Sequence, residues 1–156
     1  MTHRLQATAG ALVLAVVLLA GCSSDEDEQV SAACLAGSDE YLRALEAAPS
    51  EVRLEGETPI SDCLTPSQEA GELTRIGEEM IVAATLLNEQ GRRNAAGPAP
   101  VQLGYLVGAV QRGAEGIHAD LVRRINAAAS FSPDEQLPGS FQSGYTQGFE
   151  AGNDGG

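Results

Sequence analysis

Two long segments of the chain place apolar residues at alternating spacings of three and four, which is the pattern of one helix face. The first segment runs from Thr65 to about Gln90, and its stripe consists of Leu73, Ile76, Met80, Ala83 and Leu87. The second follows residue 100 and runs to about Ser130, with the stripe Leu103, Val107, Val110, Ala114, Ile117, Leu121, Ile125 and Ala128. Residues 92–100 between them are rich in Ala, Gly and Pro, which predicts a turn. We therefore expect an all-α fold, a small bundle built on a long antiparallel helical hairpin.

The start of the first long helix carries a capping signal. Thr65 can accept hydrogen bonds from the first free amides, and Pro66 stands where a missing N–H does no harm. Gln68 can reach back to complete a capping box. The sequence therefore predicts that this helix begins next to Thr65.

Shorter segments should flank the hairpin. Residues 31–47 show a helical pattern that ends before Pro49. Near the other end, aromatic residues and glycines each recur at every fourth position, at Phe141, Tyr145 and Phe149 and at Gly144, Gly148 and Gly152. We expect these aromatics to pack on the hairpin, against a notch formed by Gly104 and Gly108. A frayed tail is the alternative, because glycine disfavours helix by about 1 kcal/mol per residue.

An uninterrupted apolar run at residues 11–20 follows a short start that contains His3 and Arg4. This run is shorter than the roughly 20 residues needed to span a bilayer, and it has the length of a signal-peptide core. It ends in Leu19-Ala20-Gly21-Cys22. Residues 1–22 resemble the lipobox signal of bacterial lipoproteins. An ordinary secreted protein and an uncleaved membrane anchor are the alternatives.

The resemblance implies that residues 1–21 are a cleaved signal peptide and that Cys22 becomes the first mature residue. It also implies a diacylglyceryl group on the Cys22 thiol, whose two palmitate-type chains suffice for stable anchoring. The expected location is the cell membrane, lipid-anchored, on its extracytoplasmic side. Residues 22–30, which include Asp25-Glu26-Asp27-Glu28, are expected to form an acidic flexible tether. Residues 31–152 would form the helical domain, and residues 153–156 a disordered tail.

The charge of the chain excludes one class of partner. The portion from Cys22 to Gly156 has eight arginines, no lysine and 22 acidic residues, a formal charge of −14. Such a chain is repelled by polyanions, so we expect no nucleic-acid partner. The expected partners are membrane lipid, through the Cys22 anchor, and an envelope protein.

Cysteine usage points to a disulfide. Once Cys22 carries lipid, Cys34 and Cys63 remain as an even pair in an exported chain. A bridge between them would close a loop of about 30 residues and contribute on the order of 3 kcal/mol. Two separate reactive thiols, or a metal-binding pair, are the alternatives.

The sequence contains little that resembles a catalytic or metal site. Glu115 and His118 have the Glu-x-x-His spacing of di-metal helical bundles, but that architecture needs a second such pair, and the mature chain has no second histidine. Glu115 and His118 are therefore weak metal candidates, and an acid–imidazole pair on the solvent side of the Ile117 stripe is the simpler interpretation. A Gly-x-Ser-x-Gly elbow and a glycine-rich phosphate loop are both missing from the sequence.

We accordingly expect a non-enzymatic envelope lipoprotein, without a cofactor, that acts as a helical interaction or binding module. A small-ligand or metal carrier built in the bundle is the alternative, and an enzyme of unrecognised type is a third. An exposed apolar patch on a filled bundle would favour the interaction module. A cavity between the hairpin and the C-terminal aromatics, lined by His118 or carboxylates, would favour the carrier.

Overall fold

The computed structural model describes residues 29–130 and 136–156. The lipobox signal and most of the expected tether lie outside these ranges. The described residues form an all-α domain whose helices are α1 (Ser38–Ala44), α2 (Ala70–Arg93), α3 (Ala99–Gly113), α4 (Ala119–Ala129) and α5 (Gly139–Gly155). Short 3-10 helices are η1 (Ala32–Leu35), η2 (Leu45–Ala47), η3 (Ile60–Cys63) and η4 (Gly116–His118). The prediction of an all-α fold is confirmed.

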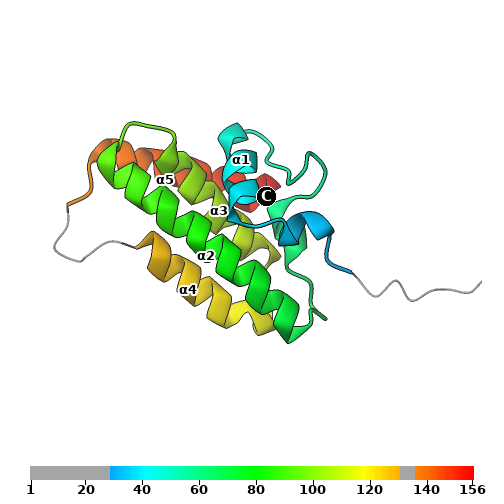
Figure 1. Ribbon diagram of the computed structural model, residues 1–156. Helices are drawn as coiled ribbons and strands as arrows, with labels where there is room; N and C mark the ends of the chain where they lie inside the picture. Colours follow the sequence, from blue (N-terminus) through cyan, green and yellow to red (C-terminus); the bar gives the residue numbers. More distant parts are fainter. Residues whose placement is uncertain (1–28, 131–135) are drawn as a thin grey trace, which may run out of the picture.

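Helix α3 is the centre of the domain, with α2 and α5 packed along it (Figure 1). The segment 95–111 contains no charged residue. Eleven residues of α3 are buried: Ala99, Pro100 and the nine consecutive residues from Gln102 to Val110. Val101 is half-buried. A helix that is apolar on all sides has to be covered on all sides, which explains its central position.

Helix α2 buries the face that its periodicity predicts. Its buried residues include Ile76, Met80, Ala83 and Leu87. The predicted start is wrong, because the helix begins at Ala70 rather than beside Thr65. The Gln68 side chain donates from Nε2 to the Cys63 carbonyl at 3.0 Å instead of closing a capping box. Residues 65–68 thus connect η3 to α2.

The second long helix of the predicted hairpin does not continue to Ser130. It is divided into α3 and α4, and residues 114–118 between them turn the chain back. Helix α4 then packs on both α2 and α3 (Figure 1). As a result Ile117, which the stripe predicts to be buried, is 51% exposed, whereas His118 is fully buried. The three–four spacing continues across the break because α4, although a separate helix, also buries Leu121 and Ile125 in the core of the domain.

Helices α3 and α5 run parallel in direct backbone contact (Figure 1). A Cβ at Gly104 would lie 2.8 Å from Phe149 N, and a Cβ at Gly108 would lie 2.8 Å from Asn153 N. The notch therefore receives the backbone of α5 rather than the aromatic rings. Only glycine permits so close an approach. The prediction that residues 141–152 pack on the rest of the domain is correct. The prediction that their aromatic rings fill the Gly104–Gly108 notch is wrong.

The C-terminal residues are part of the same interface. Residues 153–155, expected as a disordered tail, form the last turn of α5. Arg112 Nη1 donates to the Asn153 carbonyl at 3.1 Å and also to the Asp154 carbonyl. Gly156 is buried, and its carbonyl accepts from the Ser61 hydroxyl. These contacts hold the end of α5 on α3 and η3.

The N-terminal part of the domain wraps over α2 and α3. The helix predicted for residues 31–47 is interrupted at Gly37, whose φ of 93° favours glycine. The Glu79 carboxylate of α2 accepts from Ser38 N at 2.7 Å and so joins α1 to α2. The loop that follows is pinned by Val52, Leu54 and Ile60, all fully buried.

Candidate functional site

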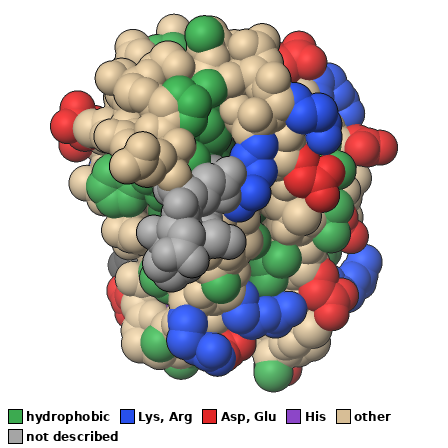
Figure 2. Space-filling view, turned by 90° about the vertical axis from the view of Figure 1, so that its left-hand side faces the viewer, with side chains coloured by type: hydrophobic (Ala, Val, Ile, Leu, Met, Phe, Trp, Pro, Cys, Tyr) green, Lys and Arg blue, Asp and Glu red, His purple; other side chains and the backbone are tan. Residues whose placement is uncertain are grey.

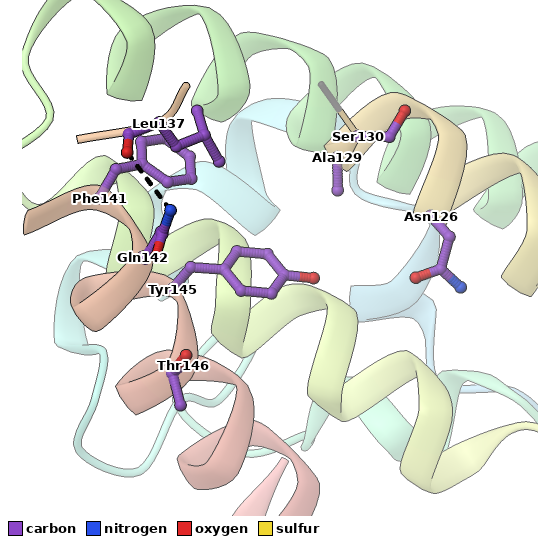
Figure 3. A pocket seen from close by; sticks show the side chains of 8 residues that line it. All are labelled: Asn126, Ala129, Ser130, Leu137, Phe141, Gln142, Tyr145 and Thr146. Carbon is purple, nitrogen blue, oxygen red and sulfur yellow. Dashed lines mark hydrogen bonds between the residues drawn. The ribbon is translucent and has the colours of Figure 1, made fainter. Parts of the chain in front are cut away.

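A cavity of about 420 Å³ lies between the end of α4 and the start of α5 (Figure 3). Eight of the described residues line it: Asn126, Ala129, Ser130, Leu137, Phe141, Gln142, Tyr145 and Thr146. The first three come from the end of α4, and the others from α5 and the residues leading into it. None of these eight carries a formal charge although the chain is strongly acidic, and we call the site the uncharged cavity after this described lining.

The walls of the cavity are held by contacts outside it. Phe141 is 1% exposed and packs so closely on Gly91 that a Cβ there would lie 2.5 Å from the ring atom Cε2. Across the cavity, the Asn88 amide of α2 donates to the Ala128 carbonyl at 2.7 Å and to the Ser130 carbonyl at 3.2 Å. Asn88 thus satisfies two carbonyls that the end of α4 leaves free. Both walls are therefore fixed to α2.

Tyr145 provides the principal polar group of the cavity. Its ring is half-buried and stacks on Phe149, with ring centroids 6.4 Å apart. The side chain extends across the space toward α4, with the hydroxyl at its far end (Figure 3). Burial raises the pKa of this hydroxyl, so it is a neutral O–H donor at physiological pH.

The remaining polar groups are partly engaged by neighbouring carbonyls. Gln142 donates from Nε2 to the Leu137 carbonyl at 3.3 Å, and Asn126 donates from Nδ2 to the Val122 carbonyl at 2.8 Å. No described residue donates a hydrogen bond to their amide oxygens, which can therefore act as acceptors. The site can therefore bind an apolar body and offer a few hydrogen bonds at its edge.

Glu115 and His118, the weak metal candidates, form a reciprocal capping box at the turn into α4. The Glu115 side chain accepts from the His118 backbone, and His118 Nδ1 accepts from Glu115 N at 2.9 Å. This bond requires neutral imidazole, with its proton on Nε2. Nε2 is buried without a hydrogen-bond partner among the described residues, and the ring also lies near the Thr65 backbone.

Burial lowers the pKa of His118, and this effect outweighs the opposing influences of Glu115 and the Thr65 backbone. The expected solvent-side pair is thus wrong for His118, since the chain turns inward there. In residues 29–130 and 136–156, no group of three or more His, Cys, Asp or Glu side chains could hold a metal ion.

Cys34 and Cys63 form a disulfide, as the sequence predicts. Their Cα atoms are 5.5 Å apart, and the bridge joins η1 to η3. The Tyr41 hydroxyl donates to the Cys34 carbonyl at 2.9 Å, and burial, together with Glu79, raises the pKa of this hydroxyl. Cys22, the predicted site of lipid attachment, lies outside the described residues.

Two other surface features differ from the uncharged cavity. Val82 and Leu86, one turn apart on α2, are 45% and 37% exposed. A second cavity, of about 440 Å³, is partly polar and includes Arg112, Ser61 and Gln29 in its lining. Arg112 and Ser61 already bind the end of α5. The second cavity is therefore partly committed to holding the C-terminal helix in place.

The charged side chains are unevenly distributed at the end of the bundle near the uncharged cavity. Figure 2 views this end and shows acidic and basic groups gathered mainly on one side, with a largely uncharged surface on the other. Helix α5 contains no charged residue before Glu150.

Comparison with known proteins yields no relative. No protein-family model matches the chain, and neither a curated protein nor a solved structure matches it. None of the helices in the described part of the chain is long and apolar enough to cross a membrane.

Sequence reasoning identified one wall of the cavity and missed the other. The recurrence of Phe141 and Tyr145 singled out the α5 side. Asn126 and Ser130 could not be placed opposite, because this requires the reversal of the chain at residues 114–118. The signal that could have revealed the reversal is Gly113-Ala114-Glu115-Gly116, where two glycines bracket the capping-box glutamate.

Proposed function

We propose that the protein is a lipid-anchored lipoprotein of the cell envelope whose helical domain is a non-enzymatic binding module. The Leu-Ala-Gly-Cys motif supports attachment through Cys22. The Cys34–Cys63 disulfide agrees with an oxidising compartment outside the cytoplasm. The acidic residues 25–28 would hold the domain away from an anionic membrane surface.

The observation that carries the binding role is the uncharged cavity between α4 and α5. Its volume of about 420 Å³ is within the range of small-molecule sites. Ala129, Leu137 and Phe141 give it an apolar surface, and the other five described lining residues each carry a polar group. Among the described residues the Tyr145 hydroxyl has no hydrogen-bond partner. These features support binding, and among the described lining residues there is no acid–base pair or nucleophile–base pair of the kind that catalysis uses.

A second candidate role is docking of an envelope protein on α2. It rests on Val82 and Leu86, whose exposed apolar side chains lie on adjacent turns. Only these two large apolar side chains of α2 are so exposed among the described residues, and the patch is therefore small. The cavity is the better-supported site.

The anchor is tested by Cys22→Ser followed by membrane fractionation. We expect the variant to lose both signal-peptide processing and lipid labelling. A Ser23→Ala control should be processed and labelled like the wild type. Unchanged processing and unchanged membrane association of Cys22→Ser would refute the lipoprotein assignment.

The two binding roles are separated by a photo-crosslinking residue in the membrane-anchored protein. Placed at Thr146, beside the cavity, it should capture a low-molecular-weight compound. Placed at Leu86 on α2, it should give a discrete protein adduct only if the second role is correct. Thr74, exposed elsewhere on α2, is the control position. Absence of adducts at both Thr146 and Leu86 would contradict a binding module.

A further inference from the structure

The charge of the α4–α5 cavity restricts what it can bind. None of the lining residues that the structure describes is acidic or basic. A charged ligand would lose hydration on entry and would find no counter-charge on these lining residues, which is unfavourable. The site therefore selects against ions.

The apolar part of the lining is large enough for a ring system or a short branched chain. Leu137, Phe141 and Ala129 contribute aliphatic and aromatic surface around a space of about 420 Å³. Phe141 and Ala129 are buried, so they are held in place by the core behind them. A wall anchored in this way is already formed before a ligand arrives, which lowers the entropic cost of binding.

The polar contribution to recognition comes from Tyr145. Its hydroxyl has no hydrogen-bond partner within residues 29–130 and 136–156, and it projects into the space between the helices (Figure 3). An O–H donor next to an apolar wall favours a ligand whose oxygen can accept that bond.

We propose that this cavity binds an uncharged small molecule with an apolar body and a carbonyl or hydroxyl oxygen that accepts from Tyr145. The inference rests on the proposed function, since it assumes that the domain is a binding module, and it names the class of ligand. The same chemistry disfavours carboxylates, phosphates and ammonium compounds at the site.

The charge selectivity is tested with two probes of similar shape, N-phenyl-1-naphthylamine and its sulfonate, 8-anilino-1-naphthalenesulfonate. All core residues of the described domain lie after residue 30, so the chain from residue 22 on, carrying Cys22→Ser, retains the whole core. We expect saturable fluorescence enhancement with the neutral probe at one site per chain. The sulfonate should bind at least tenfold more weakly. Equal or tighter binding of the sulfonate would overturn the inference.

The position of the site is tested with Thr146→Trp, which places a large side chain at the edge of the cavity. Thr146 is exposed on α5, and Thr74 is exposed on α2 away from the cavity, so Thr74→Trp is the matched control. We expect Thr146→Trp to weaken the neutral probe at least fivefold and Thr74→Trp to leave it unchanged. Equal effects of the two variants would place the probe elsewhere and refute the site.

The role of Tyr145 is tested by displacing the probe with 2-acetylnaphthalene and with 2-ethylnaphthalene, which lacks the carbonyl oxygen. Tyr145→Phe removes only the hydroxyl. We expect it to weaken the ketone about threefold to tenfold, the usual value of one hydrogen bond, and to leave the hydrocarbon within twofold. Equal effects on both compounds would show that the hydroxyl does not bind the ligand.

The failure of this inference can be distinguished from the failure of the proposed function. If the neutral probe does not bind but Leu86 captures a protein, the ligand class is wrong and the binding module stands. If the probe binds only after Phe131→Ala, the chain's own segment 131–135 is the occupant, which also overturns the inference.

Discussion

Replacing Gly148 by alanine should destabilise the protein, although alanine is the better helix former. A Cβ at this position would lie 2.7 Å from the Val101 carbonyl carbon, closer still to its oxygen, and 2.9 Å from Tyr105 N. These are backbone atoms of α3, so no side chain can rotate away. The carbonyl oxygen is the nearest atom, so helices α3 and α5 would have to separate by more than about 1 Å to restore ordinary contact. A gap of only about 0.5–1 Å already forfeits a quarter to a half of the attraction between facing atoms.

The expected magnitude follows from two opposing effects. Overpacking costs about 1–3 kcal/mol, and an obstruction by backbone belongs at the upper end. The helix propensity of alanine offsets about 1 kcal/mol. The net loss in the free energy of unfolding is then about 2 kcal/mol, or a melting temperature lower by roughly 6–10 °C for a domain of this size.

A graded series provides the assay and its controls, measured by thermal and urea unfolding. Gly71, exposed in α2, has nothing within 4 Å of an added Cβ, so Gly71→Ala should be neutral or stabilising. Gly144 would meet side-chain atoms of Pro100 and Val101 at 3.2 and 3.3 Å, so Gly144→Ala should be intermediate. If Gly148→Ala is as stable as Gly71→Ala, the close packing of α3 and α5 does not limit stability and this reasoning is refuted.

Three further changes test the contacts that position the helices. Burial lowers the pKa of His118, so the unfolded chain binds a proton at higher pH than the folded chain. The free energy of unfolding should therefore have its full value above about pH 6.5 and decrease as the pH falls toward the lowered pKa. His118→Gln can keep the hydrogen bond from Glu115 N but cannot titrate, and urea unfolding from pH 7.5 to 5 should show a smaller decrease than wild type; an equal decrease would exclude His118 as its source. Asn88→Asp removes the amide donor to α4 and should cost about 2 kcal/mol with faster amide exchange at the end of that helix, whereas unchanged exchange would contradict its capping role. Cys34→Ala with Cys63→Ala should lower the free energy of unfolding by about 2–5 kcal/mol, and reductant should lower it similarly in wild type but not in the variant; insensitivity of wild type to reductant would argue against the bridge.

Much of the fold follows from local patterns. The three–four spacing correctly identifies the buried face of α2, because a helix exposes one stripe to the core whatever covers it. The pairing of Cys34 with Cys63 follows from removing Cys22 from the cysteine count. The pattern wrongly predicts that Ile117 is buried. The three–four spacing continues through the turn between α3 and α4, so periodicity alone cannot detect that turn.

The candidate site depends more heavily on tertiary structure. Tyr145 and Phe141 stand out in the sequence as members of an aromatic stripe. The sequence does not reveal their different roles: Phe141 packs against Gly91, whereas the Tyr145 hydroxyl lies in a cavity and has no partner among the described residues. Whether Phe141 or Tyr145 is fully buried depends on where helices α2 and α4 end next to α5.

By itself the sequence determined the all-α class, the buried face of α2 and the disulfide pair, and it predicts the lipid anchor at Cys22. Only the tertiary structure decided that the chain reverses before His118, that α3 and α5 run parallel through their glycines, and that an uncharged cavity lies between α4 and α5. The physical reason is that helical periodicity records which face of a segment avoids water. Which other helix covers that face, in what direction and how closely, depends on contacts between residues far apart in the chain.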